Sequence, residues 1–178
     1  MFPELQTERF LLQQILPEDQ PFIFEGLSHP QVVPYYGVQY KTLEETRVQM
    51  VYYDQLWRSG KGTWWKITDR KTSEKAGAIG FNNYESLHRK CEIGYWLLPS
   101  HWGKGIITEV FHAVIRYLFN EKKVHRIEAL IEVENGASCA VAERAGFTRE
   151  GTLRDYEWKN DRFISLFLYS LLATDRRD

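Results

Sequence analysis

The amino-acid sequence predicts an α+β fold, in which a mixed, mostly antiparallel sheet is flanked by helices. Three short apolar segments separated by polar turns occupy residues 63–98, a spacing typical of consecutive antiparallel strands. The last of them leads through a glycine-containing loop into a stretch with helical apolar spacing at 106–122. Strand and helix patterns then alternate to residue 172, which gives the order β-α-α-β-β-β-α-β-α-β-β.

Local signals place the element boundaries. Pro17 and the two acids after it predict a helix start, because proline fits the first position and acids favour the first turn. Thr42 and Glu45 form a capping box that predicts the start of the second helix. Pro99 ends the strand before the loop, and Gly94 within that strand indicates a bulge. The expected elements are strand 9–15, helices 17–26 and 42–58, strands 63–68, 76–81 (with a turn at 82–83) and 91–98, helix 106–122, strand 126–133, helix 137–144, and strands 147–153 and 163–172.

Length, charge and cysteine content limit the class of protein. A chain of 178 residues suits one domain, expected over 1–178. The net charge of -1 gives no support for a nucleic-acid or membrane partner. Cys91 and Cys139 have no metal-ligand or disulfide spacing, so we expect reduced packing residues, no metal site and a cytoplasmic protein. The amino terminus lacks a signal-peptide pattern, and no apolar run reaches membrane-spanning length.

The loop between the strand at 91–98 and the helix at 106–122 has the composition of a phosphate-binding loop. Gly103 and Gly105 allow the backbone to approach an anion, and the following helix offers free N–H groups and a favourable dipole. The segment does not match the Walker A or Rossmann patterns. A phosphate-binding loop and an ordinary tight turn before a helix therefore both remain open at this point.

Five motifs in order carry a family resemblance. They are Thr7-Glu8-Arg9-Phe10-Leu11, Glu92-Ile93-Gly94-Tyr95-Trp96, Trp102-Gly103-Lys104-Gly105-Ile106-Ile107-Thr108-Glu109, Asn135-x-x-Ser138 and Gly146-Phe147-x-x-Glu150-Gly151. With them the chain resembles the GNAT family of N-acetyltransferases, and within it the RimJ/RimL-like branch of ribosomal-protein-alanine acetyltransferases. Ser100 stands where the family's acyl-CoA motif has Gln or Arg, a departure that affects one side-chain contact at most.

The resemblance implies the GNAT fold and acetyl-CoA as cosubstrate, with no metal. It places the pyrophosphate on the glycine loop and the pantetheine arm along the strand at 96–98. The thioester is expected in a V-shaped gap between that strand and the strand at 126–133. The implied cofactor-binding residues are Trp96, Leu97, Leu98, His101, Trp102, Gly103, Lys104, Gly105, Ile106, Ile107, Thr108, Asn135 and Ser138.

Acetyl transfer to an amine requires a hydrogen-bond donor for the leaving thiolate. Many family members use a tyrosine at the position that is Ala142 here. In the RimL-like branch a serine takes over, and it matches Ser138, whose hydroxyl is able to stabilise a thiolate by donating to it. The alternative role of Ser138 is to satisfy a backbone group at the start of a helix.

The reaction also requires a base for the amine proton. Glu157, expected after the strand at 147–153, matches the glutamate proposed as base in RimL-like enzymes, and the rings of Tyr156 and Trp158 beside it are expected to raise its pKa. Glu92 lies in an apolar strand on the face of Gly94, where burial also raises the pKa of a carboxyl. The alternatives are a solvated carboxylate at 157 and a salt-bridged one at 92.

The acceptor side is the part that the sequence defines least. An aromatic wall is expected from Tyr35, Tyr36, Tyr156 and Trp158. The acceptor is a primary amine, such as a ribosomal or other protein N-terminus, and a polyamine, an amino acid or an aminoglycoside fits as well. A non-catalytic acyl-CoA-binding module of the same fold is the alternative to an enzyme, and a nucleotide-phosphate-binding protein is a third hypothesis. Either a monomer or a homodimer is expected.

Overall fold

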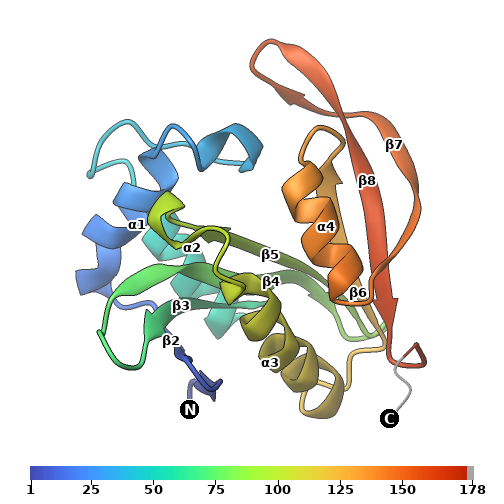
Figure 1. The fold of residues 1–178 in the computed structure, drawn as a ribbon, viewed down its shortest axis with the longest axis horizontal. Coiled ribbons are helices and arrows are strands. Elements are labelled where there is room, and N and C mark those ends of the chain that lie inside the picture. The colour runs from blue at the N-terminus through green and yellow to red at the C-terminus, as the bar shows by residue number, and fades with distance from the viewer. Residues whose placement is uncertain (176–178) are drawn as a thin grey trace.

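The computed structural model describes residues 1–175 and contains one eight-stranded sheet with the strand order β1-β2-β3-β4-β5-β6-β8-β7 (Figure 1). The strands are β1 (Leu5–Gln6), β2 (Phe10–Gln14), β3 (Thr63–Asp69), β4 (Lys75–Glu85), β5 (Lys90–Leu97), β6 (Arg126–Glu132), β7 (Thr148–Lys159) and β8 (Arg162–Leu172). The helices are α1 (Gln20–Ser28), α2 (Arg47–Arg58), α3 (Ile106–Asn120) and α4 (Gly136–Arg144), with short 3-10 turns at Pro17–Asp19, Val33–Tyr35 and Pro99–His101. The predicted α+β class and element order are confirmed, with β1 added.

The sheet consists of two halves. Strands β1 to β5 pair antiparallel in sequence order, with β3 to β5 forming the predicted meander, and β6, β8 and β7 form a second antiparallel group. The halves are joined by a short parallel pairing of β5 with β6, which runs from Lys90–Arg126 to Glu92–Glu128. Beyond these three residue pairs the two strands separate, as the resemblance implies.

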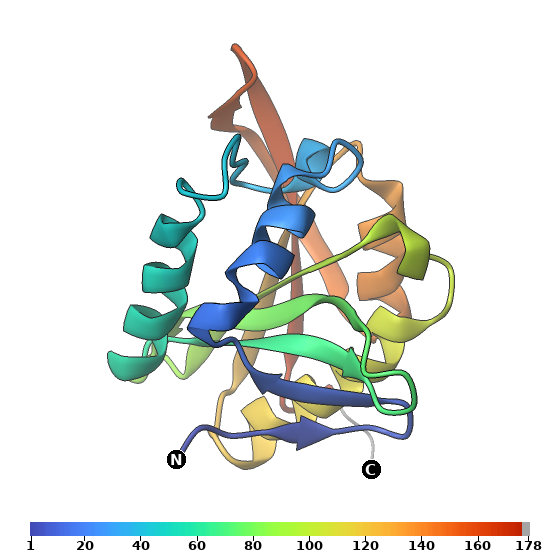
Figure 2. The same cartoon turned by 90° about the vertical axis from the view of Figure 1, so that its left-hand side faces the viewer.

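Helices cover both faces of the sheet. The apolar stripe of α3, with Val110, Val114 and Leu118, is completely buried against sheet residues that include Ile67 and Ile79. Figures 1 and 2 show α1 and α2 side by side, away from α3. These two helices bury a second cluster against the sheet. The hydrophobic cores on the two faces therefore hold β5 from both sides.

One glycine sets the distance between α1 and the sheet. A Cβ atom on Gly26 would lie 2.1 Å from the Trp96 ring, closer than any real contact. Trp96 is 3% exposed and packs on Phe22, with ring centroids 5.3 Å apart. Glu92 and Gly94 alternate with the opposite face and share this face of β5 with Trp96, as the sequence predicts.

The predicted start of α2 was wrong. Thr42 Oγ1 accepts a hydrogen bond from the Glu45 amide at 3.2 Å, but the Glu45 carboxylate accepts from the Lys41 amide instead of completing the box at Thr42. These bonds close a separate turn, and the helix begins at Arg47.

Two predictions around the β4–β5 hairpin were also wrong. The turn expected at 82–83 lies at 86–89, because β4 continues to Glu85 through an irregularity after Asn82. The bulge expected near Gly94 is absent from the pairing of β5 with β4, which is continuous from Gly77–Leu97 to Asn82–Glu92. The irregularity thus lies in β4, and β5 separates from β6 without a bulge at Gly94.

The strand expected at 147–153 is longer than its pattern indicated. β7 extends to Lys159, so Glu157 lies within a strand and not after one. Register shifts after Arg149 and after Leu153 interrupt the alternation of side chains, and most of β7 is exposed. The period-2 signal that identifies a strand is therefore broken in the sequence.

None of the helices within residues 1–175 is long and apolar enough to cross a membrane. Cys91 is buried in the core and Cys139 is partly buried, and both are free thiols.

Candidate active site

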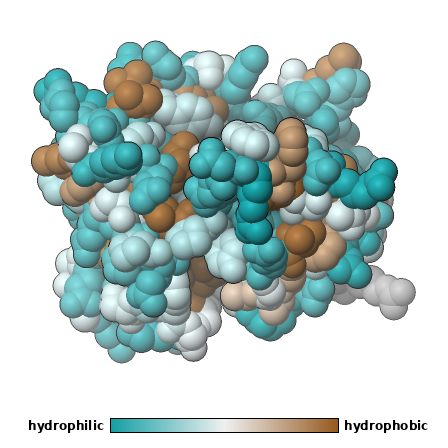
Figure 3. Space-filling model, turned by 90° about the horizontal axis from the view of Figure 1, so that it is seen from above, coloured by the Kyte–Doolittle hydropathy of each residue, from teal (hydrophilic) through white to brown (hydrophobic). Residues whose placement is uncertain are grey.

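A cleft opens where β5 and β6 separate. β5 remains paired with β4, and β6 remains paired with β8. The edge of β5 from Ile93 to Leu97 therefore faces the edge of β6 across a gap. The cleft has a volume of about 1340 Å³ and reaches from the loop before α3 to the segment around Tyr35. Figure 3 views the molecule from above and shows apolar side chains set back among hydrophilic ones on this face.

The loop before α3 has the geometry of an anion cradle at one end of the cleft. Gly103 and Gly105 have φ angles of 70° and 69°, a left-handed conformation that favours glycine. A Cβ atom on Gly103 would meet nothing within 4 Å, so the backbone faces open space. No side chain caps the first turn of α3, which leaves its N–H groups available. Lys104 also borders this end of the cleft.

Arg9 of the first motif holds this loop from behind. Its Nε atom lies 2.6 Å from Glu109 Oε2, its amide donates to Glu109 Oε1 at 2.9 Å, and its guanidinium donates to the Lys104 carbonyl at 3.1 Å. Burial acts against the charged form of Glu109, but hydrogen bonds from Thr7 and Arg9 outweigh it and lower the pKa of this carboxyl. The start of α3 is thereby tied to the start of β2. Neither Arg9 nor Glu109 was among the predicted site residues.

Twelve of the thirteen predicted cofactor residues border the cleft, and Leu98 does not. Leu98 is buried in the cluster beneath α1 and α2, and its amide donates to the Ala76 carbonyl at 2.9 Å. The indole of Trp102 folds over the edge of β5, where Nε1 donates to the Leu97 carbonyl at 2.9 Å. A carbonyl oxygen has two lone pairs, so this group is able to accept a second bond from a ligand.

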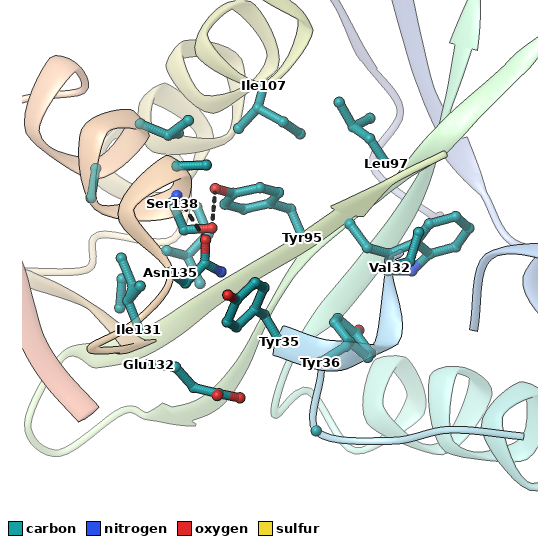
Figure 4. A pocket seen from close by; sticks show the side chains of 18 of the residues that line it. Val32, Tyr35, Tyr36, Tyr95, Leu97, Ile107, Ile131, Glu132, Asn135 and Ser138 are labelled. Atoms are coloured by element: carbon teal, nitrogen blue, oxygen red, sulfur yellow. Dashed lines mark hydrogen bonds between the residues drawn. The ribbon is translucent and has the colours of Figure 1, made fainter. Parts of the chain in front are cut away.

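Ser138 lies at the middle of the cleft with two partners (Figure 4). The Tyr95 hydroxyl donates to Ser138 Oγ at 3.0 Å, and the Ser138 amide donates to Asn135 Oδ1 at 3.1 Å. The amide of Ser138 is thus capped by Asn135, and its hydroxyl is free of the helix-start role that the sequence left open. Burial raises the pKa of the Tyr95 hydroxyl, and its bond to Ser138 acts in the opposite direction. Tyr95 therefore stays a donor at neutral pH.

Glu92 lies at the apex of the V, in the last residue pair that joins β5 to β6. Burial raises the pKa of its carboxyl, while a hydrogen bond from Asn83 Nδ2 at 3.1 Å acts against this rise. The negative charges of Glu128 and Glu157 raise the pKa of Glu92 further. Glu128 is itself paired with Arg126 at 2.7 Å. The salt-bridged role that the sequence left open thus falls to Glu128 and not to Glu92.

Glu157 borders the cleft from β7, where it pairs with Ile164 of β8. The aromatic surroundings predicted for it were wrong. Tyr156 and Trp158 are 54% and 62% exposed, and neither belongs to the lining of the cleft within the described residues. Neighbouring residues on a strand point to opposite faces, which separates these rings from the Glu157 carboxylate.

Aromatic rings do line the acceptor side of the cleft. Tyr35 and Tyr36 border it as predicted, and Tyr52 and Trp64 join them without having been predicted. Trp64 Nε1 and the Tyr52 hydroxyl both donate to Asn82 Oδ1, at 2.6 and 3.1 Å. The sequence pattern predicts only a strand position for Trp64 and a helix-face position for Tyr52. Their shared contact with Asn82 depends on the folded structure.

The sequence matches the family model of the acetyltransferase (GNAT) domain over residues 9–148. It is 35% identical over 173 residues to the uncharacterized N-acetyltransferase YoaA of Bacillus subtilis, an alignment that covers 97% of this chain and 98% of that protein. The chain belongs to the GNAT acetyltransferase family. The GNAT resemblance drawn from the five motifs is confirmed, and a GNAT acetyltransferase is an enzyme.

Further similarities place this GNAT acetyltransferase near the RimJ/RimL-like branch. It is 32% identical over 159 residues to the ribosomal-protein-serine acetyltransferase of Escherichia coli, covering 89% of this chain and 84% of that protein. The solved structure of RimL, a ribosomal L7/L12 α-N-protein acetyltransferase in complex with coenzyme A, has the same fold with a TM-score of 0.87. That alignment covers 98% of this chain and 100% of RimL at 23% identity, a likeness of fold alone.

Proposed function

We propose that this protein is a cytoplasmic, acetyl-CoA-dependent N-acetyltransferase that acts as one domain over residues 1–178. It transfers the acetyl group to a primary amine, such as a protein N-terminus or a small-molecule amine, by direct attack on the thioester in a ternary complex. The observation that carries this proposal is the arrangement of the cleft. An anion cradle lies at one end, a hydroxyl pair in the middle, and the carboxylates of Glu92 and Glu157 border the other end.

Acetyl-CoA fits the residues present. The amides around Gly103 and Gly105 and the start of α3 hold the pyrophosphate, as helix N-termini and glycine loops do for phosphates. The unpaired edge of β5 offers backbone groups to the pantetheine arm. Acetyl-CoA supplies the activated acyl carbon, and the protein supplies position, a donor and a base.

Ser138 acts on the leaving sulphur. Because Tyr95 donates to Ser138 Oγ, the serine proton remains available to the sulphur as negative charge develops there. The C–N bond forms while the C–S bond breaks, and the thiolate later takes a proton from solvent. The absence of a tyrosine at position 142 would favour a non-catalytic acyl-CoA-binding module. The hydroxyl pair of Tyr95 and Ser138 supports catalysis instead.

Either Glu92 or Glu157 removes the amine proton. The raised pKa of Glu92 supports this residue, since a base of higher pKa accepts a proton more readily. The resemblance to RimL-like enzymes supports Glu157. The proton passes from the carboxylate to solvent after each turnover.

Thiol release from acetyl-CoA tests the proposal. The purified protein is expected to release free thiol in the presence of amines, and mass spectrometry of the acceptor should find one added acetyl group. Amidated peptides with free N-termini, spermidine and an aminoglycoside form the acceptor panel. Binding of acetyl-CoA without amine-dependent thiol release would favour the non-catalytic module, and competition by ATP for the same site would favour a nucleotide-binding protein.

A further inference from the structure

The two ends of the cleft differ in charge. The end formed by the loop and by α4 is bordered by basic side chains, His101, Lys104 and Arg144. The acceptor end is bordered by the carboxylates of Glu92 and Glu157 and, beside the Tyr35 segment, by Glu132 (Figure 4). A substrate that carries phosphates and one that carries an amine are therefore held by opposite ends.

Four of the donors near the acceptor end, from Lys159, Asn83, Trp64 and Tyr52, are already bound to protein groups. Lys159, a cation beside this end, bridges Glu132 and the Pro34 carbonyl. Asn83 Nδ2 donates to Glu92, as described above. The Trp64 indole and the Tyr52 hydroxyl both donate to the side-chain oxygen of Asn82. A carboxylate on the acceptor would therefore meet like charges, and the lysine beside them is already paired with Glu132.

We infer, on the basis of the proposed amine transfer, that the acceptor is a primary amine with no carboxylate next to the amine. Amides, polypeptide N-termini and cationic amines belong to this class, whereas free α-amino acids do not. An ammonium group is attracted by the carboxylates before it loses its proton, and the aromatic rings of Tyr35, Tyr36 and Trp64 border the same end. An α-carboxylate in the same place would be desolvated beside Glu92 and Glu157 without a charged partner.

Matched acceptor pairs test this inference. L-alaninamide is compared with L-alanine, and the amidated tripeptide Gln-Ala-Ala with amidated Glu-Ala-Ala, by thiol release at equal concentrations of the neutral amine. Equal concentrations of the neutral amine remove the effect on the rate of the different amine pKa values in each pair. We expect kcat/KM to be at least about 20-fold higher for L-alaninamide than for L-alanine. The factor should be smaller for the peptide pair, because the carboxylate of Glu-Ala-Ala is farther from the amine.

A variant at the rim of the cleft gives a second, independent test. Val48 borders the acceptor end from α2 and is 69% exposed, so a long side chain fits there without disturbing the core. Val48→Arg adds a cation and should raise kcat/KM for L-alanine by at least about 3-fold, with little change for L-alaninamide. Val48→Gln is the matched control and should not raise kcat/KM for either L-alanine or L-alaninamide.

The outcomes separate the inference from the function on which it rests. Turnover of L-alanine equal to or better than that of L-alaninamide would overturn the inference and leave the acetyltransferase function standing. An equal gain for L-alanine from Val48→Arg and Val48→Gln would also contradict it, because charge would then not be the cause. Failure of every amine, spermidine included, to release thiol would overturn the proposed function itself.

Discussion

Replacement of Tyr95 by Phe removes one hydroxyl and keeps the ring. The ring packs edge-on against Phe111, with centroids 5.4 Å apart, and this contact does not depend on the hydroxyl. The bond lost is the one to Ser138 Oγ at 3.0 Å. A neutral hydrogen bond of this kind contributes about 0.5–1.5 kcal/mol, so kcat should fall by about 2- to 12-fold. The dissociation constant for coenzyme A should hardly change, and the Tm should fall by only about 1–6 °C.

Ser138→Ala removes the proposed donor to the sulphur itself. A hydrogen bond to a charged group contributes about 1.5–3 kcal/mol, which corresponds to a loss of about 10- to 150-fold in kcat. If Tyr95 acts only through Ser138, the double variant Tyr95→Phe/Ser138→Ala should be no slower than Ser138→Ala. Stopped-flow or steady-state thiol release measures the three rates, and calorimetric titration measures coenzyme A binding.

Three results would refute this reasoning. Wild-type kcat in Tyr95→Phe, together with a slow Ser138→Ala, would mean that the tyrosine does not orient the serine. Multiplicative losses in the double variant would mean that the two hydroxyls act separately. A wild-type rate in Ser138→Ala would remove the serine from the reaction and return the hydroxyl pair to a packing role.

Three further predictions concern binding, pH dependence and stability. Gly105→Glu places a strained, negative side chain against the anion cradle and should weaken acetyl-CoA binding at least about tenfold, about 1.4 kcal/mol, in a calorimetric titration. Because the pKa of Glu92 is raised, its protonated form persists to higher pH, and kcat/KM should fall on the acid side with an inflection above the ordinary carboxyl value. Glu92→Gln should abolish this limb, and Glu157→Gln should move it to lower pH by removing a negative charge. Gly26→Ala drives a methyl group into Trp96 and should lower the free energy of unfolding by about 1–3 kcal/mol in urea titrations.

Each of these predictions has a result that contradicts it. Unchanged acetyl-CoA affinity in a folded Gly105→Glu variant would remove the cradle from its assigned role. If Glu157→Gln abolishes the acid limb and Glu92→Gln keeps it, the two carboxylates exchange roles, and if both keep it, the amine loses its proton through water. Gly37, where a Cβ would meet nothing within 4 Å, is the control for Gly26, and equal losses from both alanine variants would show that the close approach is unimportant.

The parts of the fold that the sequence predicted well have local causes. Pro99 cannot donate to a sheet ladder, and the glycines after it open a loop before a strongly amphipathic helix, so this unit was placed within two residues. Boundaries that depend on tertiary partners were less accurate. The capping residues at Thr42 and Glu45 exist, but they close a turn ahead of the helix.

The candidate site shows the same division. Its backbone elements follow from motif spacing, whereas its side-chain pairs join residues far apart in the chain. Tyr95 lies on the same face of β5 as the core residues Ile93 and Leu97, so the sequence pattern predicts a core residue there. Its hydrogen-bond partner Ser138 lies 43 residues away in the chain. The environment of Glu157 was misjudged because chain neighbours on a strand point apart. Pairings of this kind are not encoded in periodicity.

The separation of β5 from β6 has a consequence for the evolution of specificity. The open edge from Ile93 to Leu97 presents main-chain groups, which are the same whatever the side chains are. A ligand arm that lies along this edge is recognised as an additional strand, by β-augmentation. Substitutions on β5 that preserve packing are therefore expected to leave recognition of the arm intact. The residues around the acceptor end are under no such constraint, so this half of the cleft is free to diverge toward new amines while the cosubstrate stays the same.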